Sequence, residues 1–283
     1  MMKVLLGNLV NVKTGKLDAN QADINGKYPF FTCSKEISKI NSYSYDCECV
    51  LIAGNGDLNV KYYNGKFEAY QRTYILTSID SNSLSNKYLY WFMNRYIVQL
   101  RNQSIGGVIK YIKLGDLTNI SLSLPTIDDQ RRIVRIFESI ERLISKKVFI
   151  LKALDDLIKS RFVEMFGDIR ERGRFKARKW KDVLDIFNGK DYKAVQVDKG
   201  GYPVYGSGGI IARANDYICP AGTIIIGRKG SINNPILVNE KFWNVDTAFG
   251  IVPKEIINIS YLYYFCKHYN FNYLLNCRMK LNT

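Results

Sequence analysis

The chain has 283 residues, 47% of them hydrophobic and 24% charged, a composition that excludes a disordered or fibrous class and supports a folded core. It carries 41 Lys and Arg against 26 Asp and Glu, a net charge of +15, together with 20 Tyr and 14 Phe. The positive excess runs along the whole sequence, at +5 in residues 1–125, +6 in 126–179 and +4 in 180–283. Some basic proteins bind nothing acidic, but this combination favours a nucleic-acid partner.

Metal and membrane sites find little support in the sequence. None of the six cysteines forms the Cys-x-x-Cys pair of a zinc site, and His268 is the one histidine. We expect no metal and reduced cysteines within the core. The N-terminal apolar run is too short for a signal peptide, and no run of 18 apolar residues occurs. These features predict a cytoplasmic protein with no membrane partner.

The first 125 residues are predicted to form short strands with turns and one small helix. Residues 50–53 are an apolar run that stops at Gly54, which is typical of a buried strand entering a tight turn. Tyr28 precedes a proline and is therefore expected in extended backbone. Residues 88–96 have the apolar spacing of an amphipathic helix.

A long helix is predicted next, because residues 126–166 contain neither Gly nor Pro. Asp128 or Asp129 is expected to cap its start, and Gly167 to end it. About 38 residues make a rod of roughly 57 Å, too long for the core helix of one small domain. Its apolar residues recur at steps of three and four, as in a coiled-coil seam that must be covered by a partner. The expected packing positions are Ile133, Ile136, Ile140, Leu143, Leu151, Leu154, Ile158 and Phe162.

After a basic linker at 168–179, the sequence repeats itself. At a shift of 174 residues, three blocks match: 10–16 with 184–190, 26–31 with 200–205, and 50–56 with 224–230. The same shift places Thr73 over Thr247, and a shift of 173 places residues 88–92 over 261–265. A near-constant offset over about 80 residues indicates two copies of one domain.

No catalytic motif holds up on inspection. Residues 222–229 have the glycine spacing of a phosphate-binding loop, but Arg228 and Lys229 stand where Lys and Ser or Thr are required. Asn234-Pro235 lacks the second proline and the aromatic residue of the adenine methyltransferase motif. His268 is better explained as a structural residue of a helix than as a general base. These observations predict a protein that is not an enzyme.

DNA readout needs polar side chains for base edges and Lys or Arg for phosphates, and the turns between the predicted strands supply them. The turn after the buried strand is the first candidate in each copy, with residues 70–73 opposite 244–247 as the second and residues 103–110 as the third. Composition alone leaves an ordinary hairpin turn equally open. The candidate DNA-binding residues are Lys16, Asn55, Asn59, Gln71, Arg72, Ser104, Lys110, Lys190, Arg228, Lys229, Ser231 and Asn233.

A short motif at the start of the long helix is typical of one protein family. The run Leu-Pro-x-x-x-x-Gln at Leu124, Pro125 and Gln130 opens the long helix, and a second block covers residues 243–249. With the repeat, these features resemble the specificity subunits of type I restriction-modification systems over essentially the whole chain. The resemblance implies an α/β fold with two repeated target-recognition domains, 1–125 and 180–283, joined by a long coiled-coil-type helix at 126–167 and the linker at 168–179.

The resemblance also implies partners. Each recognition domain is expected to read one half of a split site in double-stranded DNA. The helix is expected to bind methylation subunits that use S-adenosylmethionine, and restriction or translocase subunits that use ATP and Mg²⁺ would join to cleave. No cofactor is expected on this chain itself. A methyltransferase or nuclease with an accessory duplication and a non-DNA scaffold remain as alternatives.

The sequence departs from the family pattern in one respect. The second copy ends at Thr283, equivalent to about residue 110 of the first copy, so the second long helix expected in the family is missing. The stripe on the central helix would then lack its partner. We expect self-association through that stripe, and an inactive or partner-dependent form is a further alternative.

Overall fold

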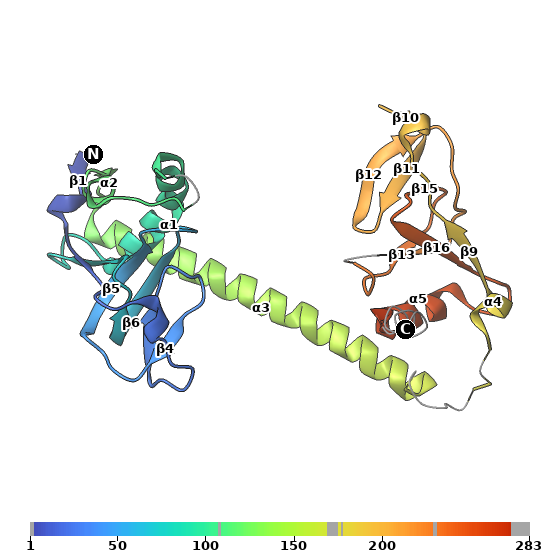
Figure 1. Cartoon of the computed structure of the whole chain (residues 1–283), viewed down its shortest axis with the longest axis horizontal. Coiled ribbons are helices and arrows are strands. Elements are labelled where there is room, and N and C mark those ends of the chain that lie inside the picture. Colours follow the sequence, from blue (N-terminus) through green and yellow to red (C-terminus); the bar gives the residue numbers. More distant parts are fainter. Residues whose placement is uncertain (1–2, 107–108, 169–174, 177, 229–230, 273–283) are drawn as a thin grey trace. The chain divides into compact units, whose positions relative to one another are not determined.

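The computed structural model describes residues 3–106, 109–168, 175–176, 178–228 and 231–272. The chain divides into two compact units, Met1–Val148 and Phe149–Thr283, called here the first and second unit. Each unit combines a twisted β-sheet with a helix packed on one face, as expected from the sequence (Figure 1). The mixed α/β class and the long helix between two sheet-rich regions are confirmed.

The first unit is built on a six-stranded sheet of order β2-β7-β5-β6-β3-β4. A separate antiparallel pair joins β1 to β8. The strands are β1 (Lys3–Leu5), β2 (Val10–Thr14), β3 (Tyr28–Phe31), β4 (Ser38–Ile40), β5 (Tyr45–Ala53), β6 (Val60–Ala69), β7 (Thr73–Ser78) and β8 (Ser121–Ser123), and the helices are α1 (Asn86–Gln103) and α2 (Leu114–Thr118).

Strand β5 has hydrophobic cores on both of its faces, because successive strand side chains point to opposite sides. Val50 and Ile52 pack with the buried face of α1, at Leu89 and Met93, while Leu51 belongs to an aromatic cluster on the other face. The α1 core positions follow the helical repeat that the sequence predicted. Burial on both faces makes β5 the centre of the first unit.

The second unit repeats this plan in two four-stranded sheets, β14-β13-β16-β9 and β10-β12-β11-β15. Its elements are α4 (Trp180–Val183), β9 (Leu184–Asn188), β10 (Gln196–Val197), β11 (Tyr202–Gly206), β12 (Gly209–Ala214), β13 (Thr223–Gly227), β14 (Ile236–Val238), β15 (Trp243–Asn244), β16 (Ala248–Pro253) and α5 (Ile259–His268). Where β6 runs unbroken in the first unit, β14 and β15 are separate strands in the second, so one sheet becomes two.

The strand pairing corrects one part of the predicted repeat. Ala53 pairs with Thr73 in the first unit, whereas Gly227 pairs with Ala248 in the second, so β7 and β16 match at an offset of 175. The predicted match of Thr73 with Thr247 is therefore wrong by one residue. The extra residue lies in the turn between β13 and β14, because Thr223 pairs with Val238 whereas the equivalent Cys49 pairs with Tyr63. Arg72 consequently corresponds to Thr247.

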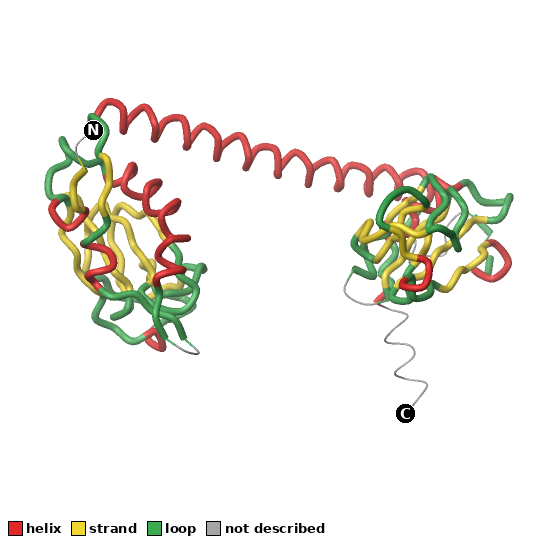
Figure 2. The backbone as a smooth tube through the Cα atoms, turned by 90° about the horizontal axis from the view of Figure 1, so that it is seen from above, coloured by secondary structure: helices red, strands yellow, loops and turns green. Residues whose placement is uncertain are grey.

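The long helix α3 (Ile127–Phe166) is a single continuous helix (Figure 2). Its cap is Thr126, not the predicted Asp128 or Asp129: the Thr126 hydroxyl accepts from the backbone N–H of Asp129 at 3.2 Å and donates to the Asp129 carboxylate at 2.7 Å. Gly167 ends the helix with φ of 84°, as predicted.

The side chain of Gln130 fixes the start of α3 within the first unit. This residue is fully buried, and its amide oxygen accepts from the backbone N–H of Ser85 at 3.0 Å. Its amide nitrogen donates to the carbonyls of Ser83 and Pro125, at 2.8 and 3.0 Å. The Gln130 side chain thus forms hydrogen bonds with three backbone groups. These bonds explain in structural terms why a glutamine follows the Leu-Pro motif.

The predicted packing stripe of α3 is covered only toward its two ends. Phe162 is 5% exposed and stacks on Tyr261 of the second unit at a ring separation of 5.6 Å. Ile133 is partly buried in the first unit. The residues between remain exposed by 39–64%: Ile136, Ile140, Leu143, Leu151, Leu154 and Ile158.

No helix in the described part of the chain is long and apolar enough to span a membrane.

Candidate DNA interface

Each unit places a turn at the end of its central buried strand, as the sequence predicted. The turn after β5 starts at Gly54, whose backbone N–H donates to the carbonyl of Arg72 at 2.8 Å. The turn after β13 starts at Arg228, whose backbone N–H donates to the carbonyl of Thr247 at 2.9 Å. The two turns therefore leave equivalent strands and are joined to equivalent segments of the neighbouring strand.

Lys16 and Lys190 lie at equivalent positions beside these turns. Each follows a glycine that packs against backbone: a Cβ at Gly15 would lie 2.1 Å from the Ala69 carbonyl oxygen, and a Cβ at Gly189 would lie 1.8 Å from that of Val245. No other residue type fits there without moving the backbone. Both lysine side chains are exposed, as a phosphate contact requires.

The structure brings most first-unit candidates to one end of the sheet. Asn55 forms a β-bridge with Tyr111, and Gly56 donates to the Lys110 carbonyl at 2.8 Å. The backbone N–H of Gln71 donates to the Leu17 carbonyl at 2.9 Å. Lys16, Asn55, Gln71, Arg72 and Lys110 therefore come from four chain segments but share one edge.

A hollow of about 360 Å³ opens at this edge. Two tyrosines, two cations, two polar residues, two apolar residues and one glycine line it: Tyr74, Tyr111, Arg72, Lys113, Thr14, Gln71, Ile112, Leu114 and Gly54. The Tyr74 hydroxyl donates to the Ile112 carbonyl at 3.2 Å, and burial raises its pKa, so the ring is fixed and uncharged. Arg72 and Lys113 give the hollow a positive rim suited to an anionic ligand.

Two asparagines among the predicted contact residues, Asn59 and Asn233, form hydrogen bonds that hold the turns. The Asn59 amide nitrogen donates to the carbonyls of Cys33 and Asp57, at 2.8 and 2.9 Å, and its oxygen accepts from Lys61. In the second unit, Asn233 of the turn after β13 accepts from the backbone N–H of Phe271 at 2.9 Å and donates to Asn270 at 3.2 Å. Both asparagines therefore hold their turns in place.

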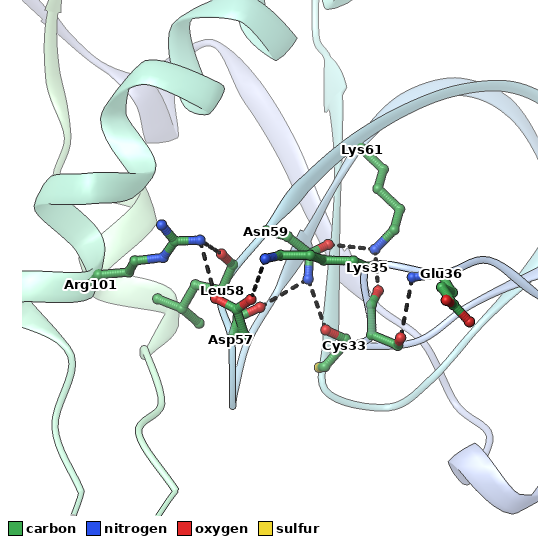
Figure 3. Close-up of polar contacts among 9 residues, drawn as sticks. Cys33, Lys35, Glu36, Asp57, Leu58, Asn59, Lys61 and Arg101 are labelled. Carbon is green, nitrogen blue, oxygen red and sulfur yellow. Dashed lines mark hydrogen bonds and ion pairs between the residues drawn. The ribbon is translucent and has the colours of Figure 1, made fainter. Parts of the chain in front are cut away.

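Lys35 and Arg101, two cations that the sequence did not single out, belong to the same region (Figure 3). Both bind Asp57 in the turn after β5: Lys35 at 2.8 Å and Arg101 at 3.2 Å. Arg101 also donates to the Leu58 carbonyl at 2.6 Å. The hydrogen bond from Lys35 lowers the pKa of the Asp57 carboxyl. No pattern in the sequence marks this cluster, because its members come from three distant segments.

The remaining candidates lie as follows. The Ser104 hydroxyl donates to the Arg101 carbonyl at 2.6 Å at the end of α1, and the Gln71 side chain donates to Asp18 at 2.9 Å. The Ser231 hydroxyl is buried and has no hydrogen-bond partner among the described residues. Lys229 lies outside the described residues.

A metal centre finds no support in this region. Across the described ranges, no three His, Cys, Asp or Glu side chains lie close enough to hold a metal ion. Burial raises the pKa of the Cys219 and Cys266 thiols, each to about 12. Cys49, Cys219 and Cys266 are buried, as predicted, whereas Cys33 and Cys47 are only partly buried.

Comparison with known proteins decides the family. The model of the type I restriction modification DNA specificity domain matches residues 1–154 and 173–280. The chain belongs to this family. Over 130 residues it is 46% identical to the type I restriction enzyme EcoDI specificity subunit of Escherichia coli, a match that covers 46% of the chain and 29% of that relative. The aligned part thus spans less than a third of the relative's length.

A solved structure has a similar fold. The crystal structure of a type I restriction-modification S subunit from M. genitalium is 17% identical, with a TM-score of 0.69, covering 99% of this chain and 79% of that one. At this identity the likeness concerns the fold alone. It extends to both units, and the resemblance to specificity subunits expected from the sequence is confirmed.

Proposed function

We propose that this chain is the DNA-reading, non-catalytic subunit of a type I restriction-modification complex. Each unit reads one half of a split site in double-stranded DNA with the turns at the end of its central strand. The observation that carries the proposal is the repeat itself: two units share strand order and register but differ at the turn tips, in a chain of net charge +15. One scaffold can thus present two different sets of base contacts.

The exposed stripe of α3 supports the partner side of the proposal. Leu143 and Leu151 are 61% and 64% exposed, on a helix that presents apolar residues at coiled-coil spacing. Methylation subunits that carry S-adenosylmethionine would dock on this helix, and restriction or translocase subunits that use ATP and Mg²⁺ would join them. No cofactor needs to bind this chain directly.

Without those partners, the stripe would pair with a second copy of the chain. Light scattering at micromolar concentration is expected to show self-association that a Leu143→Lys/Leu151→Lys variant loses while keeping its far-ultraviolet circular dichroism. A clean monomer of the unaltered chain would contradict this part of the proposal.

Selection from random duplexes tests the DNA-reading role. The chain, co-purified with its methylation subunit, is expected to enrich two short fixed sequences separated by a fixed unspecified spacer. Arg72→Ala should relax one half only, since Arg72 lies in the first unit. Enrichment of a single continuous site, or of none, would contradict the proposal.

A further inference from the structure

The hollow at the end of the first-unit sheet has a counterpart in the second unit that is filled. The hollow is lined by Gly54 and by the paired residues Thr14 and Tyr74 of β2 and β7. In the second unit, the residue at the Gly54 position is Arg228, and the corresponding strand pair is Asn188 and Phe249. The Arg228 side chain covers that pair.

Three contacts fix Arg228. Its guanidinium carbon lies 4.2 Å from the ring centroid of Phe249, a cation–π distance. Its Nη2 donates to the side-chain oxygen of Asn188 at 3.1 Å. Its backbone N–H bonds the Thr247 carbonyl, so the side chain is anchored at both ends.

The charge of Arg228 remains available. No ion pair between described residues includes this arginine, whereas Arg101 in the first unit is paired with Asp57. Its Nε is buried with no hydrogen-bond partner among the described residues, and the contact to Asn188 uses one N–H of the Nη2 group. The N–H groups left over lie at the end of the guanidinium and are the ones able to reach a ligand.

We infer that Arg228 reads a guanine in the half-site of the second unit, with Phe249 and Asn188 as positioning residues. This inference rests on the proposed function. A guanidinium fork can bind either a phosphate or a base edge in two parallel hydrogen bonds, and the variants described below separate these two ligands. A guanidinium held in one plane by a ring face and an amide suits the paired O6 and N7 acceptors of guanine in the major groove.

The first unit makes no such contact from this position, because Gly54 has no side chain. A Cβ there would lie 2.4 Å from the Arg72 carbonyl oxygen, so the glycine is required by close packing. The two units therefore differ in base preference at equivalent points of the same scaffold. The first unit must read its half-site with residues around the hollow instead.

Sequence selection with the methylation-subunit complex tests this inference. The unaltered chain should fix a G·C pair at one position of the second-unit half-site. Arg228→Lys retains the charge but loses the fork, so preference at that position should fall about 10- to 100-fold while all other positions stay fixed. Phe249→Leu and Asn188→Ala should relax the same position partially. Lys190→Gln, the matched control, should lower affinity for every sequence alike.

The possible failures are distinct. If the unaltered chain selects no split site, the proposed function fails and the inference with it. If it selects a split site that Arg228→Lys leaves unchanged, or binds all sequences uniformly less, the proposed function stands and Arg228 is a structural residue or a phosphate contact. Thermal unfolding of each variant identifies a loss of fold, in which case the Phe249→Leu and Asn188→Ala profiles decide.

Discussion

The turns after β5 and β13 leave equivalent strands of two equivalent units, but they are held by different chemistry. In the first unit, Asp57 joins Lys35 and Arg101 in an exposed ion cluster. In the second unit, the side-chain amide of Asn233 forms uncharged hydrogen bonds with Asn270 and with the backbone N–H of Phe271. An asparagine side chain holds the turn in both units, but Asn233 lies one residue before the position that the strand pairing makes equivalent to Asn59, and its partners differ.

The comparison shows which parts of the repeat are constrained. The buried strands keep their register because a slip of one residue would turn every core side chain to the wrong face. The turns carry no such constraint, and their residues are free to differ provided that each turn is tied to a neighbouring element. A duplicated domain can therefore change its surface at the turn tips while its core stays the same.

The largest expected effect tests whether the units have separate cores. Ile52 and Ile226 occupy equivalent buried positions, in different hydrophobic clusters. Ile52→Ala and Ile226→Ala should each lower the free energy of unfolding by about 2–5 kcal/mol, through lost burial and a residual cavity. Hydrogen exchange should show that each variant increases exchange in its own unit only. Loss of protection in both units from either change would mean a single cooperative core.

The next effect concerns how the first unit holds α3. Gln130→Ala leaves the backbone groups that it binds without partners and should cost about 1–3 kcal/mol in unfolding free energy. The exposed Gln103→Ala is the matched control and should cost little. Equal chemical-denaturation midpoints for the two variants would show that Gln130 does not fix the helix.

A smaller effect, on DNA affinity, concerns the turn after β5, which the Asp57 ion pairs hold in place. Asp57→Asn releases Lys35 and Arg101, so binding to random-sequence duplex should tighten and its salt dependence should steepen by about 1–2 in log-log slope. Asp128→Asn on α3 changes the net charge equally and should leave the slope unaltered. Fluorescence anisotropy across a salt series measures both, and identical slopes would argue against phosphate contacts here.

The smallest effect lies where α3 meets the second unit. His268 lies 5.2 Å from Phe162, and burial, with Lys159 and Lys267, lowers its pKa. The unfolded chain therefore binds the proton more readily, and the stability of the second unit should fall as the pH drops below the ordinary histidine value near 6.5. His268→Gln should remove this dependence between pH 7 and 5, with the first unit as internal reference. An unchanged pH profile would assign the effect to other groups.

Much of this architecture could be predicted, because it depends on periodic patterns. The buried runs at 50–53 and 224–226, the helix from 126 to 166 and its end at Gly167 follow from apolar spacing and glycine chemistry. The one-residue shift between β7 and β16 could not, because the extra residue lies in the turn after β13, where the residues follow no periodic pattern. The Thr126 cap was missed because Asp128 and Asp129 are equally good capping residue types.

The candidate site was predictable only in part. Glycines and turn residues located the turns after β5 and β13, near Lys16, Arg72 and Arg228, and the role of these residues in DNA binding stays a prediction. The Asp57 cluster and the contact of Arg228 with Phe249 bring together residues that are more than 20 positions apart in the sequence, and no local pattern encodes such pairs. Sequence reasoning also assigned Asn59 and Asn233 to DNA contacts without seeing that their amides are engaged in holding the turns.

The central claim, that two copies of one unit read two halves of one site, is tested most directly in cells. The chain is co-expressed with its methylation subunit, and methylated adenines are mapped across the genomic DNA. The account predicts one split motif, marked on both halves, with a fixed spacer between them. A continuous motif, or methylation confined to a single half, would contradict it.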